Sequence, residues 1–137
     1  MEVKYMNNPV DWKAFEYKFS TGSRPAFEGL AYILFCHEFK QTYGIFRYYN
    51  QPYIETQPAD TDDGHKVGFQ AKYYDAGTQM SSKEQDLKDA IKGAKNKYAG
   101  IDRIIFYINK EFSASSAKDK DKPEYQLHIE KYGADLG

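Results

Sequence analysis

The stretch Lys66-Val-Gly-Phe-Gln-Ala-Lys-Tyr-Tyr-Asp75 decides the fold that this sequence predicts. It is apolar and aromatic, and turn-forming residues flank it on both sides, so it predicts a β-strand. Side chains alternate across a strand, and its hydrophobic side chains therefore share one face. These are Val67, Phe69, Ala71 and Tyr73. Gln70 and Lys72 share the opposite face. Because a buried lysine is costly without an anionic partner, we expect a carboxylate close to Lys72.

Composition limits the class of protein. The chain has 137 residues, which suits one domain with a single core. Its 13 Tyr and 9 Phe exclude a disordered chain, and its longest apolar run is too short to span a bilayer, so we expect no membrane association. The start of the chain does not resemble a secretory signal, and the single Cys36 cannot form an internal disulfide. We therefore expect a reducing, cytoplasmic location.

Several elements are predicted before the central strand. An arm is predicted over residues 1–9, and helices are predicted over 11–18 and about 24–42. Strands are predicted over 43–49 and 52–58, and a polar hairpin turn follows over 59–65. The longer helix carries apolar residues at three- and four-residue spacing, namely Phe27, Leu30, Ala31, Leu34 and Phe35. Since Tyr32, Ile33 and Cys36 extend this apolar surface almost all round the helix, we expect the middle of the helix to be well buried.

The elements after the central strand begin with a helix. A capping box, Ser81-Ser-Lys-Glu84, predicts its start, and its core residues are Leu87, Ala90, Ile91, Ala94 and Tyr98. A strand over 101–108, a charged loop over 113–122 and a helix over 123–132 follow, and Gly133 is the expected stop.

The order is helix, strand, strand, strand, helix, strand, helix. It predicts an α/β fold with a mixed sheet flanked by helices. We expect a single domain over 1–137, with an arm and short helix in 1–23 and the core in 24–135. The abrupt end at Gly137 suggests a piece of a longer multidomain protein.

Glu55 is the best candidate partner for Lys72. A hairpin between the two strands would bring it near Gln70 and Lys72, and Glu28 lies on the helix face that carries the apolar stripe. Two carboxylates and an amide oxygen are ligands suited to Mg²⁺, and such an ion assists phosphodiester hydrolysis. Lys72 could then orient or deprotonate water, or hold a phosphate oxygen. The alternative is structural, because a Glu–Lys pair across two strands commonly supports a sheet.

A second set of lysines is a candidate for nucleic-acid contact. Lys88, Lys92 and Lys95 follow one another at helical spacing on the outer side of the predicted helix, and Glu84 is placed to pair with Lys88. The alternative is an ordinary solvated helix face. The formal net charge of −1 gives the chain no general attraction to nucleic acid, so any such binding must rest on a local patch.

The pattern Phe27-Glu28 on a helix, Glu55 near a strand end and Gln70-Ala71-Lys72 in the next strand resembles the PD-(D/E)xK nuclease superfamily. It is most similar to the Mrr-like branch, in which Q-x-K replaces D/E-x-K. The resemblance covers roughly residues 24–135 and includes nuclease domains at the N-terminus of large bacterial antiphage defence proteins of the STAND NTPase type.

The resemblance implies a restriction-endonuclease-like fold and Mg²⁺-dependent cleavage of double-stranded DNA, with Mn²⁺ as a possible substitute. Glu55, Gln70 and Glu28 would bind the metal, and Lys72 would be the catalytic lysine. It also implies an effector domain that oligomerises through further domains. Two departures stand out: Glu replaces Asp at position 55, and Pro52 precedes it by three residues rather than one. The neutral Gln70 at the second acid position also removes one negative charge. A catalytically inactive domain for oligomerisation or nucleic-acid binding is the alternative, and RNA cleavage would use the same residues.

Overall fold

Three strands form the centre of the computed structural model, which describes residues 10–41, 54–55, 58–110 and 122–137. They are β1 (Ala59–Asp60), β2 (Lys66–Lys72) and β3 (Arg103–Ile108), in the order β1-β2-β3. β1 pairs with β2 antiparallel, and β2 pairs with β3 parallel over six residues, from Val67 opposite Arg103 to Lys72 opposite Ile108. The sheet is therefore mixed, as predicted.

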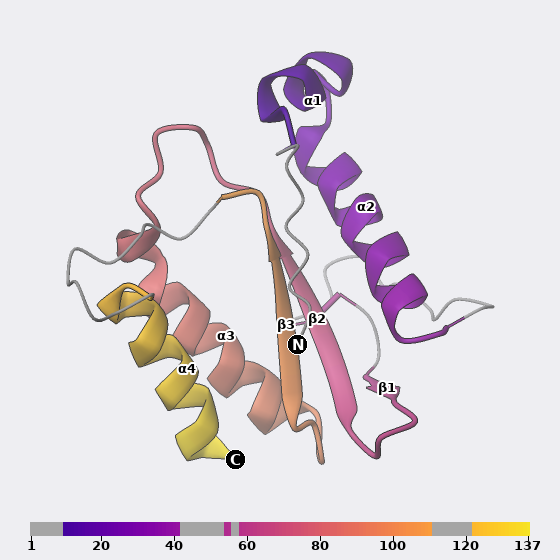
Figure 1. Ribbon diagram of the computed structural model, residues 1–137, viewed down its shortest axis with the longest axis vertical. Helices are drawn as coiled ribbons and strands as arrows, with labels where there is room; N and C mark the ends of the chain where they lie inside the picture. Colours follow the sequence, from indigo (N-terminus) through magenta and orange to yellow (C-terminus); the bar gives the residue numbers. More distant parts are fainter. Residues whose placement is uncertain (1–9, 42–53, 56–57, 111–121) are drawn as a thin grey trace, which may run out of the picture.

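Helices cover both faces of this sheet (Figure 1). On one side lie α1 (Trp12–Lys18) and α2 (Ser23–Glu38), and on the other lie α3 (Glu84–Lys97) and α4 (Glu124–Leu136). A short 3₁₀ turn, η1 (Met80–Lys83), leads into α3. The α/β class with a helix-flanked mixed sheet is confirmed. In the described ranges, no helix combines the length and the apolar character that crossing a bilayer requires.

β2 is packed on both of its faces. Val67, Phe69 and Ala71 form a core cluster with buried side chains of α2, and the rings of Phe69 and Phe35 lie 4.6 Å apart. On the opposite face, Gly68 lies against Ile54 and Ile101, which belong to a second cluster with α3. The predicted alternation of side chains along this strand is confirmed.

The strand ends earlier than predicted, at Lys72 rather than at residue 75. The reason is that a side chain, not a neighbouring strand, bonds the backbone just after Lys72. Asn109, which is buried, accepts a hydrogen bond from the Tyr74 N–H at 2.7 Å and donates one to the Tyr74 carbonyl at 2.8 Å. Asn109 therefore satisfies the backbone just after β2 without strand pairing.

The prediction that the middle of α2 is well buried is wrong for one side of the helix. Phe27, Ala31 and Phe35 are buried, but Leu30, Ile33 and Leu34 are 37%, 64% and 45% exposed. The sheet contacts only one side of the helix, so part of the predicted stripe faces away from it. The helix also ends at Glu38 rather than about residue 42, and Lys40 follows with a left-handed backbone (φ 56°).

Of the two strands predicted before β2, one lies outside the described residues and the other is described in part. The range 43–49 lies outside the described residues, as do the arm 1–9 and most of the loop 113–122. Of the range 52–58, residues 54, 55 and 58 are described, and none of them is assigned to a strand. β1 begins only after Pro58, which shortens the turn. That turn is closed by the Thr61 N–H donating to the His65 carbonyl at 2.8 Å, with Gly64 at φ 83°.

The predicted capping box before α3 is also wrong. The helix begins at Glu84, after η1, and the residue at its N-cap makes no side-chain capping bond. The Glu84 carboxylate is engaged elsewhere, with Lys88 at 3.3 Å and His128 at 2.9 Å. Of the predicted core residues, Leu87, Ala90, Ala94 and Tyr98 are buried and Ile91 is half-buried.

α4 is longer than predicted, because it runs through the expected stop at Gly133 to Leu136. Gly133 lies against α3, where an added Cβ would meet Ile91 Cδ1 at 3.9 Å. β3 begins at Arg103, two residues after the predicted start.

Two glycines provide a matched test of the packing around β2. A Cβ on Gly68 would lie 2.9 Å from Ile54 Cγ2 and 3.0 Å from Ile101 Cδ1, whereas a Cβ on Gly29 in α2 would meet nothing within 4 Å. We expect Gly68→Ala to lower the free energy of unfolding by about 1–3 kcal/mol through overpacking. Gly29→Ala should instead raise it by about 0.5–1 kcal/mol, because alanine favours the helix. Urea unfolding of both variants measures these changes, and equal effects would contradict the close packing at Gly68.

Candidate active site

A polar cavity of about 450 Å³ lies at the C-terminal end of β2. All four predicted site residues line it, and they come from three parts of the chain. Glu28 is on α2, Glu55 precedes β1, and Gln70 and Lys72 are on β2. The rest of the lining is Arg24, Ala71, Tyr73, Tyr74, Asp75, Thr78 and Lys83. The four predicted side chains thus line one cavity although Glu28 and Lys72 are 44 positions apart in the sequence.

Glu55 is fixed to the edge of β2 by two hydrogen bonds. Its backbone N–H donates to the Phe69 carbonyl at 2.8 Å, and its carboxylate Oε1 accepts from the Ala71 N–H at 3.2 Å. A strand edge presents backbone groups that need partners, and here a side chain supplies one of them. The bond from Ala71 sets the orientation of the Glu55 carboxylate beside Gln70 and Lys72.

Gln70 contributes an amide oxygen to the cavity. Its Oε1 is buried, and it has no hydrogen-bond partner in the described part of the chain. A buried carbonyl oxygen without a partner costs about 1–3 kcal/mol, and a water molecule or an ion is one way in which such an oxygen is satisfied. The arrangement therefore suits a water molecule or a cation beside Gln70.

The surroundings of Lys72 shift the pKa of its side chain. Burial lowers the pKa of its ammonium, and the charges of Arg24 and Lys83 act in the same direction. The carboxylates of Asp86 and Glu55 oppose this, with Asp86 the stronger of the two. The expected anionic neighbours of Lys72 are present, and the net result is still a lowered pKa.

Tyr73 forms the wall of the cavity that faces α1. Its hydroxyl donates to Glu16 Oε1 at 2.8 Å, and its ring contacts Trp12, Phe15 and Phe27. Burial, with the Glu16 carboxylate, raises the pKa of Tyr73 to about 12, so this hydroxyl stays protonated at neutral pH. Tyr73 therefore joins α1 to the end of β2.

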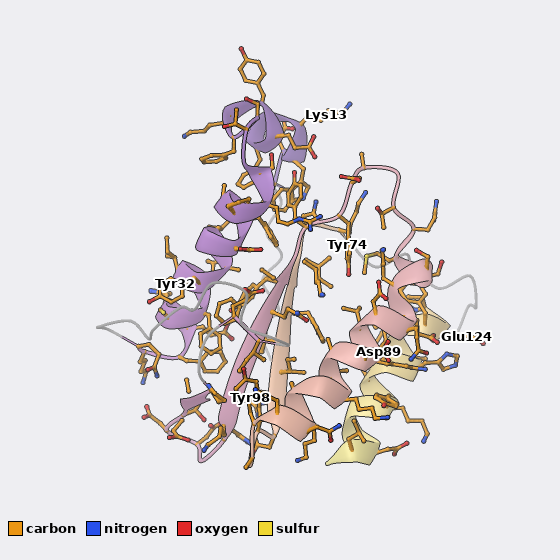
Figure 2. The ribbon with its side chains drawn as sticks, turned by 180° about the vertical axis from the view of Figure 1, so that it is seen from behind. Lys13, Tyr32, Tyr74, Asp89, Tyr98 and Glu124 are labelled. Atoms are coloured by element: carbon orange, nitrogen blue, oxygen red, sulfur yellow. The ribbon has the colours of Figure 1, made fainter. Side chains whose placement is uncertain are left out.

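Sequence reasoning missed three charged residues at this site. Arg24 and Lys83 line the cavity, and Asp86 acts on Lys72 from the first turn of α3. Arg24 and Lys83 each stand at the start of a helix, which is the only signal that the sequence carried for them. Figure 2 shows Tyr74, another lining residue, and Tyr98 at opposite ends of the sheet, which locates the cavity at the Tyr74 end.

No protein-family model matches this chain, and its sequence matches no curated protein. What the cavity can do therefore rests on the chemistry of its own side chains.

The cavity residues fit a magnesium ion better than they fit a transition metal. In the described ranges, no group of three or more His, Cys, Asp or Glu side chains is arranged to hold a metal. The candidate set instead combines the carboxylates of Glu28 and Glu55 with the amide oxygen of Gln70. Mg²⁺ prefers oxygen ligands and keeps several waters, so few protein groups are sufficient. The buried Gln70 oxygen without a hydrogen-bond partner is the observation that favours this fit.

The three lysines predicted to contact nucleic acid do not form one exposed face. Lys88 is half-buried, paired with Glu84 and 5.8 Å from the centre of the Tyr132 ring. Lys95 donates to the carbonyls of Ile101 and Gly137 at 3.2 and 2.9 Å, and only Lys92 of the three is exposed. The expected outer stripe is wrong for Lys88 and Lys95, because α4 packs beside them; their contact with nucleic acid stays a prediction.

The lowered pKa of Lys72 predicts a pH dependence of stability. In the unfolded chain its pKa returns to about 10.4. Between the lowered folded value and the unfolded value, the unfolded chain binds more protons, so the free energy of unfolding rises with pH in that window. In urea unfolding between neutral pH and about pH 10, we expect this rise to be smaller in Lys72→Met. Lys92→Met, which removes an exposed lysine, should keep the parent's slope; identical slopes in all three proteins would contradict the shift.

Proposed function

We propose that this chain is a metal-dependent endonuclease domain that hydrolyses phosphodiester bonds of double-stranded DNA. The observation that carries the proposal is the convergence of Glu28, Glu55, Gln70 and Lys72 on one polar cavity. Acidic and amide oxygens beside a lysine of lowered pKa are the groups that phosphodiester hydrolysis requires.

In the proposed mechanism, Glu28, Glu55 and Gln70 would hold the divalent ion. A bound Mg²⁺ or Mn²⁺ supplies charge stabilisation to the phosphate and lowers the pKa of nearby water. Burial lowers the pKa of Lys72, which is the direction that accepting a proton from the attacking water requires. In its ammonium form it can donate to a non-bridging phosphate oxygen as negative charge builds up. The Ala71 N–H holds the Glu55 carboxylate in place during both steps.

The resemblance to PD-(D/E)xK nucleases extends this proposal in three directions. The helix-flanked mixed sheet is compatible with a restriction-endonuclease-like fold of the Mrr-like type. The likeness to defence proteins favours an antiviral effector role in the bacterial cytoplasm. Since the net charge is only −1, assembly of several copies would increase the number of cations that meet one DNA molecule.

A non-catalytic domain for oligomerisation or nucleic-acid binding is the second candidate. One observation favours it: in the described residues, no three acidic, His or Cys side chains form a metal-binding group. Isothermal titration with Mg²⁺ and Mn²⁺ separates the two candidates, because the nuclease must bind an ion at Glu28 and Glu55. Ion binding that Glu28→Gln weakens supports the nuclease, and no ion binding favours the second candidate.

Plasmid nicking tests the proposed residues directly. We expect the protein to nick supercoiled DNA in Mg²⁺ and to lose this activity in a chelator. Glu55→Gln and Lys72→Met should each lower the rate by about 100-fold or more, the usual effect of removing a charge-stabilising or proton-transfer group. Lys97→Met, at the exposed last residue of α3, serves as the control that keeps the parent's rate.

Glu55→Gln retains an oxygen that can accept from the Ala71 N–H, so the fold at the edge of β2 should persist. Thermal unfolding of each variant checks this. If correctly folded Glu55→Gln and Lys72→Met cut DNA as fast as the parent, the assigned site is wrong.

A further inference from the structure

Two cations in the cavity have no part in the chemistry proposed above. Arg24 lies in the first turn of α2, and Lys83 is the last residue of η1, directly before α3. The two helices cover opposite faces of the sheet, yet both residues line the same cavity as Lys72. Three cations from three elements therefore meet at the end of β2.

Lys83 is held in place rather than extended into solvent. Its Nζ lies 5.2 Å from the centre of the Tyr74 ring and 3.7 Å from Asp86 Oδ2, and its side chain is 30% exposed. The ring and the carboxylate limit the conformations of a long side chain, which lowers the entropy lost when a ligand binds. Asp86 is far more exposed than Lys83, so an incoming anion can compete with it for the ammonium.

Arg24 connects the cavity with a neighbouring one. A second polar cavity of about 470 Å³ shares Arg24, Tyr73 and Asp75 with the first, and Glu16, Ser20, Ser23 and Ala76 complete its lining. A guanidinium is planar and donates in a fork that matches phosphate oxygens. Two adjoining cavities joined at an arginine suit an extended ligand better than a single nucleotide.

We infer that Arg24 and Lys83 form a phosphate clamp that holds the DNA backbone on either side of the phosphodiester facing Lys72. The inference rests on the proposed nuclease function of the cavity and adds the residues that bind the substrate there. It replaces Lys88, Lys92 and Lys95, of which only Lys92 is exposed, as the main contact with the DNA phosphates. Phosphate contacts fix the register of a nucleic acid without reading its sequence, so the clamp predicts cleavage with little sequence preference.

The clamp also explains the balance of charge around Lys72. Glu28, Glu55 and Asp75 line the cavity together with the three cations, so the site is close to neutral without a ligand. A divalent ion beside the acids would leave a net positive cavity, which favours a polyanion. Arg24 and Lys83 thus complement the metal ligands rather than oppose them.

Binding without metal tests the clamp separately from catalysis. The probe is a short fluorescein-labelled DNA duplex, and its Kd is measured by anisotropy in a chelator over a series of salt concentrations. Arg24→Gln and Lys83→Gln should each weaken binding by about 5- to 30-fold and lower the salt slope by about one. Lys97→Gln, which removes an exposed lysine from the last residue of α3, should stay within about twofold of the parent. Lys83→Arg keeps the charge and should restore most of the affinity, which a purely structural role would not require.

A substitution at Asp86 should change DNA affinity in the opposite direction, toward tighter binding. Asp86→Asn releases Lys83 from its ion pair and should tighten DNA binding severalfold. Asp89→Asn removes the same charge from the same helix, where Asp89 contacts Gln85 and not Lys83, so it should have a smaller effect. Equal gains in the two variants would show a general charge effect and would overturn the role of Lys83.

The outcomes for the clamp and for the nuclease are distinguishable. If Arg24→Gln and Lys83→Gln bind DNA as tightly as a parent that nicks plasmid, the clamp is wrong and the nuclease proposal stands. If both variants lose affinity while the parent never cuts DNA in Mg²⁺, the clamp stands as a binding site and the nuclease proposal fails.

Discussion

The close packing at Gly68 is the constraint on which the rest of the structure depends. β2 is covered on both faces, and on one of them Ile54 and Ile101 approach the strand more closely than any side chain at position 68 would allow. Gln70 and Lys72 continue the same face toward the end of the strand. Because side chains alternate with a period of two, the register that seats Gly68 in the core also places these two polar groups in the cavity.

Where the regular strand pairing ends, side chains rather than neighbouring strands form hydrogen bonds with the backbone. The Glu55 carboxylate accepts from the Ala71 N–H, and the Asn109 amide bonds both backbone groups of Tyr74. Each replacement satisfies the backbone and at the same time fixes a group at the cavity. The candidate site is therefore an extension of the sheet's own bonding, which explains how a polar cavity can be held firmly beside a hydrophobic core.

The local pattern was enough to predict that β2 forms and which side chains lie on each of its two faces. Alternation is a property of the strand itself, so Val67, Gln70 and Lys72 could be assigned without tertiary information. The exposure of Ile33 could not, because it depends on the sheet contacting only one side of α2. Asp86 and Lys83 could not be placed either, since their positions depend on the turn η1 that shifted the start of α3. The position of a residue that depends on how two elements pack together cannot be predicted from one stretch of sequence.

The parallel pairing of β2 with β3 has a consequence for how the molecule reaches its native state. Parallel neighbours need a long crossover, and here η1 and α3 must form between the two strands. Contacts so distant along the chain require loop closure before they stabilise anything, so they form late in folding. Lys83 and Asp86 lie on that crossover. A newly synthesised chain would accordingly complete its β1–β2 hairpin before it had a finished cavity, and the proposed phosphate site would be the last part of the molecule to form.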